Sequence, residues 1–317
     1  MPAVELRVLT WNVFHGRDGA PGVGPTWRST WLRRPVSDGR HVHLNRKLIG
    51  PIGELIAAAT PTVAALQEVP PAAVRELARA TRMRAIYVRT SPMFGPHELR
   101  EWLGRRNPDL WRSHEGNANV ILVHPAWRIV PGSTRSFRQN PLPVIAETAR
   151  RLDLRSGEIA SWATEARRLL AVKIRSPEGE TVAVCCVHCH ATRRTRELAA
   201  TEIRRAAGFA LSYAPPGEPL ILAGDLNARF SRDPVLHELE QMGLCELPAG
   251  PGPDRGLGID HLFHRDLEVV AGPRRWDPSE RDVVLREGGP LLVRLSDHDA
   301  VEAVYRVPEA DAHRRRR

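Results

Sequence analysis

The segment LILAGDLN, at residues 220–227, places a short apolar run directly before an aspartate and an asparagine. Such a run, ended by turn residues, is typical of a buried strand, so Leu220–Ala223 is predicted to be a strand with Asp225 at its tip. Asp225 and Asn227 then share one face of the tip and can hold a water molecule between them. A Gly-Asp-x-Asn sequence is also common as a plain turn, so the segment alone leaves both interpretations open.

Five further polar motifs occur along the chain, and most of them follow an apolar run. Carboxylate and amide oxygens on separate strand ends suit a hard cation such as Mg²⁺. Histidines beside them suit a bound phosphate. The pattern therefore predicts metal-assisted hydrolysis of a phosphate ester. The five motifs are Thr10-Trp11-Asn12, Leu66-Gln67-Glu68, Val187-His188, Ile259-Asp260-His261 and Ser296-Asp297-His298.

In this order the motifs resemble those of the endonuclease/exonuclease/phosphatase superfamily, from about Leu6 to Val307. The resemblance implies a deoxyribonuclease I-like fold: an α/β, four-layer α/β/β/α sandwich of two mixed β-sheets flanked by helices, with the site at one rim. The mixture of strands, hairpins and a few helices favours the same architecture. Because the motifs reach from residue 12 to residue 298, we expect residues 1–308 to form one domain. Residues 309–317 are predicted to be a disordered basic tail.

The resemblance also implies a role for each motif residue. Glu68 matches the principal metal-binding glutamate, and Asn12 matches an asparagine close to metal and phosphate. Asp297 is predicted to assist in binding Mg²⁺, for which Mn²⁺ can substitute. Asp225 would orient or deprotonate the attacking water, and Asn227 would contact the scissile phosphate.

Two histidines are predicted to stabilise the transition state. His188 would reach the phosphate, and His298 would be held by Asp260, since a carboxylate on the far imidazole nitrogen favours the protonated ring. Asn117 and His190 are weaker candidates for substrate binding. A turn-forming asparagine and a surface histidine are the alternatives for these two.

The substrate is not determined by these motifs. Phe14 stands where abasic-site endonucleases carry an aspartate, which argues against DNA repair. The net charge of +9 favours a nucleic acid, although 44 of the 46 basic residues are arginine and a solvated basic surface is the alternative. The basic stretch Arg17–Lys47, with Trp27 and Trp31, would either grip a polyanion or form a solvated loop. A phosphodiesterase or nuclease is preferred over a phospholipid or soluble-phosphomonoester phosphatase, and over a non-catalytic binding protein.

The remaining expectations concern the cellular setting. No run of 18 apolar residues and no secretory signal is visible, so we expect a cytoplasmic protein without a transmembrane segment, assumed to be monomeric. Three of the four cysteines crowd one strand-like segment, which is poor geometry for a disulfide framework. A zinc site at Cys186 and Cys189 is a weak alternative, because on a strand they face opposite sides.

Periodicity assigns most of the elements. Residues 140–165 fit both helical and strand patterns and are left unassigned. Strands are predicted at 4–10, 62–66, 85–88, 220–223, 257–263 and 301–307, neighbouring strands at 119–124 and 127–130, a hairpin at 169–174 and 181–188, and helices at 48–59, 72–82 and 195–212.

Overall fold

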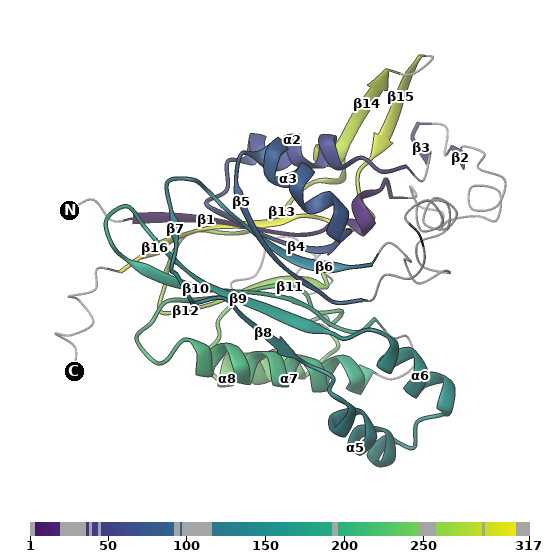
Figure 1. Ribbon diagram of the computed structural model, residues 1–317, viewed down its shortest axis with the longest axis vertical. Coiled ribbons are helices and arrows are strands. Elements are labelled where there is room, and N and C mark those ends of the chain that lie inside the picture. Colours follow the sequence, from purple (N-terminus) through teal and green to yellow (C-terminus); the bar gives the residue numbers. More distant parts are fainter. Residues whose placement is uncertain are drawn as a thin grey trace.

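Two six-stranded mixed sheets face each other in the computed structural model, which describes residues 4–19, 36–37, 40–43, 46–91, 96, 116–191, 196–246, 258–286 and 289–308 (Figure 1). The first sheet contains β1 (Val4–Asn12), β4 (Val63–Val69), β5 (Arg84–Arg89), β6 (Ala118–Val123), β13 (Glu268–Arg275) and β16 (Val301–Val307), in the order β13-β16-β1-β4-β6-β5. The second contains β7 (Arg128–Ile129), β8 (Arg135–Arg138), β9 (Arg168–Arg175), β10 (Thr181–His188), β11 (Leu220–Asp225) and β12 (Asp260–Arg265). Its order is β12-β11-β10-β9-β7, with β8 also paired to β9. Two short hairpins, β2 (Val36–Ser37) with β3 (Val42–His43) and β14 (Asp282–Arg286) with β15 (Pro290–Arg294), lie outside the sheets.

Helices cover the outer face of each sheet. α2 (Ile49–Ala59) and α3 (Val74–Thr81) lie on the first sheet, and α7 (Arg196–Tyr213) and α8 (Val235–Gln241) lie on the second (Figure 1). α5 (Leu142–Leu152) and α6 (Ser156–Thr164) form a separate pair beside the second sheet. The predicted four-layer α/β/β/α sandwich is confirmed. The helix predicted at 48–59 is α2, and Pro51 lies in its first turn, where proline is tolerated.

Alternation along the strands builds three apolar layers. On β10, Val184 and Cys186 point between the two sheets, whereas Cys185 and Val187 pack toward α7. Because both faces of the strand are buried, the sequence there reads as a continuous apolar run. Cys189 also lies on the α7 side, opposite Cys186, and all four cysteines are free thiols. The two side chains of the Cys-x-x-Cys sequence therefore cannot share one metal ion.

Strand register brings the polar motifs to one edge. β10 and β11 are parallel, so they end together, and His188 pairs with Asp225. β12 is antiparallel to β11 and starts at the same edge, where Asp260 pairs with Asp225. In the first sheet the parallel strands β1 and β4 place Asn12 beside Gln67, the residue before Glu68. Each sheet therefore contributes one row of polar side chains to the same rim.

Gly224 is required by the close approach of two strands at this rim. Its φ is +150°, and a Cβ atom built there would lie 1.9 Å from the carbonyl oxygen of Val187. Any side chain would push β11 away from β10 directly beside Asp225. The glycine of the Gly-Asp-x-Asn motif is thus explained by packing between the strands.

Some elements differ from the sequence-based expectation. Residues 119–124 and 127–130 were predicted to be neighbouring strands, and this is wrong: β6 pairs with β4 and β5, whereas β7 pairs with β9 of the other sheet. The turn at Pro125 carries the chain across the sandwich, and buried Trp127 packs between the sheets. The unassigned region 140–165 contains α5 and α6. α8, β13 and the β14–β15 hairpin were not predicted.

Two sequence features lie mainly outside the described residues. They are the tail at 309–317 and most of the basic stretch from Arg17 to Lys47, including Trp27 and Trp31. At the start of that stretch, Arg17 is fully buried, so its side chain does not offer a surface contact. Within the described part of the chain, no helix is long and apolar enough to span a membrane.

Candidate active site

The side chain of Asn12 joins the two sheets at the polar rim. Its Nδ2 donates to Oε1 of Glu68, at 3.1 Å, and to Oδ2 of Asp225, at 3.0 Å. Its Oδ1 accepts from the backbone N–H of Phe14. Both donors and the acceptor are satisfied in this orientation, so the amide oxygen faces the backbone and the amide nitrogen faces the carboxylates. Asn12 thereby holds two carboxylates from different sheets close together.

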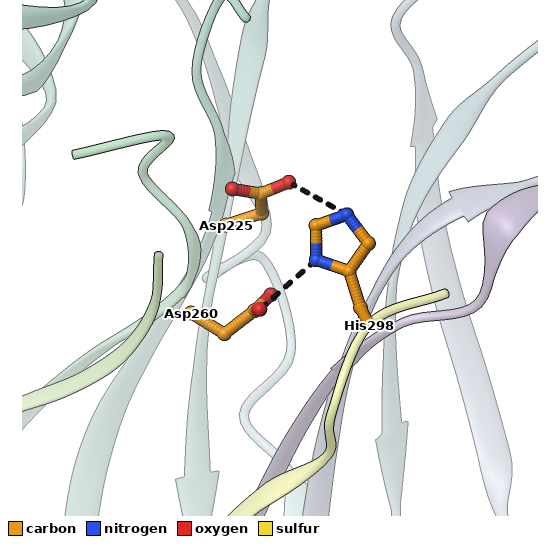
Figure 2. A group of neighbouring side chains, drawn as sticks. All are labelled: Asp225, Asp260 and His298. Atoms are coloured by element: carbon orange, nitrogen blue, oxygen red, sulfur yellow. Dashed lines mark hydrogen bonds and ion pairs between the residues drawn. The ribbon is translucent and has the colours of Figure 1, made fainter. Parts of the chain in front are cut away.

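His298 lies between two aspartates, as Figure 2 shows. Its Nδ1 donates to Oδ2 of Asp260 at 2.9 Å, and its Nε2 lies 3.8 Å from Oδ2 of Asp225. The Oγ of Ser296 accepts from the backbone N–H of His298, and Nε1 of Trp11 donates to the backbone carbonyl. The ring is therefore fixed on both sides, and the predicted Asp260–His298 pair is present.

The protonation of this cluster follows from burial and charge. Burial raises the pKa of Asp225, and the neighbouring charge of Asp260 adds to the rise, against the opposing effect of His298. Burial alone would lower the pKa of His298, but the carboxylates of Asp260 and Asp225 outweigh it and raise that pKa well above its ordinary value. His298 is thus a protonated imidazolium at neutral pH, held between two carboxyl groups.

Two further histidines face the carboxylates of Glu68 and Asp225. Nε2 of His188 lies 3.7 Å from Oε1 of Glu68 and 3.6 Å from Oδ2 of Asp225. Burial, with the nearby charges of Arg167 and His298, lowers the pKa of His188 well below its ordinary value, so this ring is neutral. Nε2 of His15 lies 3.3 Å from Oε2 of Glu68. His15 was not predicted, because no recurring motif in the sequence singles it out.

These groups line one cleft of about 280 Å³. Asn227 lines it and donates from Nδ2 to the carbonyl of Cys189, while its backbone N–H donates to Oδ1 of Asp225. Asn117 also lines the cleft, and its buried Oδ1 has no hydrogen-bond partner among the described residues. The cleft is lined by His15, Glu68, Asn117, Ser161, Thr164, Glu165, Arg167, His188, His190, Ala191, Asp225, Asn227 and His298.

The structure brings nearly all predicted site residues together. His190 lines the cleft, and burial lowers its pKa to about 4, so it is neutral. Asp260 stands behind His298. Asp297 is the most exposed of the set, with 44% of its side chain accessible and its Oδ1 4.0 Å from Nε2 of His298. The assignment of catalytic, metal-binding and substrate-binding roles to these residues stays a prediction.

Backbone strain is concentrated in the segments that carry the site. Nine described residues other than glycine have a positive φ, and five of them are Phe14, His15, Glu68, Asn227 and Ser296. The left-handed region costs energy for residues with a Cβ atom, and such residues cluster at functional sites. Two of these residues, Glu68 and His15, line the cleft directly.

Arg167 and Glu165 are site residues that the sequence analysis missed. They follow α6 directly, and Nη2 of Arg167 lies 2.6 Å from Oε2 of Glu165. The missed signal is a pair of charged residues next to the apolar run of β9. It was hidden because residues 140–165 could not be assigned to an element.

The donor set fits a divalent cation. Two carboxylates, Glu68 and Asp225, are joined by one amide, and His188, whose ring faces both of them, is neutral. Carboxylate oxygens are the ligands that a hard divalent cation prefers. Asp225, Asp260 and His298 also offer ligand atoms within 4.8 Å of one another, although the Asp260–His298 hydrogen bond competes with that use. These residues therefore form a candidate site for a divalent metal ion.

Comparison with known proteins gives one family. A model of the Endonuclease/Exonuclease/phosphatase family matches residues 9–298. Among solved structures, the chain is similar to an endonuclease/exonuclease/phosphatase from Beutenbergia cavernae, at 19% sequence identity and a TM-score of 0.62 over 96% of this chain and 72% of that one. It is similar to an endonuclease/exonuclease/phosphatase family protein from Bacteroides thetaiotaomicron, at 13% sequence identity and a TM-score of 0.60. This match covers 98% of this chain and 100% of that one. It is also similar to a mannosyl-6-phosphatase of that species, at 12% sequence identity and a TM-score of 0.56. This match covers 95% of this chain and 99% of that one. No curated protein matches the sequence.

Proposed function

The chain belongs to the endonuclease/exonuclease/phosphatase family, and from this premise we propose that it hydrolyses phosphate esters with the aid of a divalent metal ion. One observation carries the proposal. Asn12 holds the carboxylates of Glu68 and Asp225 together, directly beside the Asp260–His298 pair. Carboxylates, a charged imidazolium and neutral histidines at one strained rim match the requirements of phosphoester hydrolysis.

Each side chain has a definite part in the proposed reaction. Asp225 orients a water molecule and takes its proton as the water oxygen forms a bond to phosphorus. The bond from phosphorus to the leaving alcohol oxygen breaks, and that oxygen takes a proton from solvent. The imidazolium of His298 donates a hydrogen bond to the phosphate as negative charge builds up, and neutral His188 donates a second one. The hydrogen bond from His298 to Asp260 favours the protonated imidazole and fixes the orientation of the ring.

The metal ion supplies Lewis-acid stabilisation of the phosphate oxygens. We propose Mg²⁺, with Mn²⁺ as a substitute, because the available donors are oxygens of carboxylates and amides. Glu68 is the principal ligand in this proposal. Asn12 and Asp297 are predicted to assist, and for Asn12 direct ligation requires rotation of the amide away from the N–H of Phe14.

The substrate class is tested by a panel measured with Mg²⁺, Mn²⁺ or EDTA. It contains single-stranded and duplex DNA, RNA, sphingomyelin, inositol phosphates and sugar phosphates, since one structurally similar protein is a mannosyl-6-phosphatase. Hydrolysis that needs the metal ion supports the proposal, and equal activity in EDTA contradicts it. If a nucleic acid is the substrate, binding should weaken steeply with salt, because each neutralised phosphate releases counterions.

Asp260 and His298 are expected to act as one unit. Asp260→Asn and His298→Ala should each lower kcat by about 10²-fold, within the range for acid–base and electrostatic groups. The double variant should lose far less than the product of the two effects, because Asp260 acts through His298. The measurement is kcat for all four proteins at one pH. Multiplicative losses would show that the two residues act independently.

A further inference from the structure

Arg167 is a buried cation with unused hydrogen-bond donors at the wall of the cleft. The residue is 6% exposed and lines the cleft together with His188 and His190. Nη2 contacts Glu165, but Nε and Nη1 have no hydrogen-bond partner among the described residues. A buried donor without a partner costs about 1–3 kcal/mol, so such groups are rare in native proteins. A ligand that carries several oxygen acceptors would supply partners that the described residues do not.

The charge of Arg167 is maintained in spite of its burial. Burial lowers the pKa of the guanidinium, but the carboxylates of Glu165, Glu202 and Glu68 outweigh this effect and raise that pKa above its ordinary value. The histidines beside it, His188 and His190, are neutral. Arg167 therefore presents a permanent positive charge to the cleft, with a planar fork that matches the oxygens of a phosphate.

The wall next to Arg167 is held in place by hydrogen bonds and limits the size of the ligand. Ser161 and Thr164, from the end of α6, line the cleft. α6 is joined to α7 by a hydrogen bond, because Nε1 of Trp162 donates to the buried carboxylate of Glu202 at 2.5 Å. Nδ2 of Asn140 donates to the carbonyls of Trp162 and Glu165, which holds the end of the helix. The cleft of about 280 Å³ is slightly smaller than typical small-molecule sites, which measure roughly 300–1,000 Å³.

We propose that Arg167 binds a non-esterified phosphate oxygen, and that the cleft takes the terminal phosphate of a compact phosphomonoester. The inference rests on the proposed function. A monoester carries one more charged oxygen than a diester, and that oxygen needs a cation in addition to those at the reacting centre. In a diester the corresponding oxygen is alkylated, so it accepts weakly and brings a second substituent against the fixed wall of α6.

The first test measures binding of inorganic phosphate by calorimetry, in EDTA and without turnover. Arg167→Gln should weaken binding about tenfold or more, as expected for loss of a charge-assisted hydrogen bond, whereas Arg167→Lys should retain part of it. Arg168→Gln is the matched control, because this neighbouring arginine does not line the cleft, and it should bind phosphate like the wild type. Unchanged binding in a folded Arg167→Gln protein, or no phosphate binding by the wild type, overturns the inference.

The second test compares 4-nitrophenyl phosphate with bis(4-nitrophenyl) phosphate, which share a leaving group. The wild type with Mg²⁺ or Mn²⁺ should prefer the monoester in kcat/KM, and Arg167→Gln should raise KM for the monoester about tenfold. If hydrolysis depends on the metal ion but kcat/KM is higher for the diester and unchanged in Arg167→Gln, this inference is overturned. The proposed function is not affected by that result. Arg167-dependent phosphate binding with no hydrolysis of any phosphate ester supports the anion site and contradicts the proposed function.

Discussion

Asp225→Asn is expected to lower kcat by roughly 10³-fold, within the 10²–10⁴-fold typical of general acid–base groups. The carboxylate lines the cleft, and hydrogen bonds from Asn12 and from the backbone N–H of Asn227 fix its orientation there. The amide of asparagine keeps the shape but cannot take a proton from water. The measurement is kcat at saturating metal. Glu268→Gln, which removes an exposed carboxylate far from the cleft, is the control.

The same variant has a second expected effect, on stability against pH. The folded-state pKa of Asp225 is raised above the unfolded value of about 3.9. Below the unfolded-state pKa, Asp225 is protonated in both the folded and the unfolded state. Between the two pKa values, it is protonated only in the folded state. The free energy of unfolding therefore falls as pH rises through this window. In EDTA between pH 5 and 8, the wild type should lose more stability than Asp225→Asn. Parallel curves would show that Asp225 has an ordinary pKa.

Removal of the metal ion is expected to have an effect of similar size. A catalytic metal ion supplies several kcal/mol of charge stabilisation, and about 4 kcal/mol corresponds to roughly 10³-fold in rate. EDTA should therefore abolish hydrolysis, and Mg²⁺ or Mn²⁺ should restore it. Glu68→Gln should raise the metal concentration for half-maximal activity by more than the 10–100-fold that loss of an outer-shell partner causes.

Comparison of two variants locates the metal ion within the site. If Glu68 is the principal ligand, Glu68→Gln shifts the metal requirement and Asp260→Asn does not. If the ion lies instead among Asp225, Asp260 and His298, the Asp260 variant shows the larger shift. A fall in melting temperature that matches the loss of activity in Glu68→Gln would make Glu68 a structural residue.

The structural part of the sequence-based prediction rests on local physics. An apolar run such as Leu220–Ala223 is buried wherever it lies, and a polar residue directly after it must be at an edge. The two mixed sheets, the hairpin of β9 and β10, and the long helix α7 follow from such patterns. The family resemblance added what local patterns do not contain, namely the pairing of Asp260 with His298, and the structure shows that hydrogen bond.

The tertiary structure alone decided which groups meet. Register places His188, Asp225 and Asp260 side by side, and sequence separation carries no information on register between distant strands. The neutral state of His188 arises from burial and from charges contributed by other elements. Arg167 lies next to a segment whose periodicity fits both helix and strand. The position of Arg167 at the wall of the cleft depends on how α6 packs against Glu202 of α7. The same packing leaves Nε and Nη1 of Arg167 without a hydrogen-bond partner among the described residues. Local periodicity reports burial, whereas long-range packing decides charge, register and the shape of the cleft.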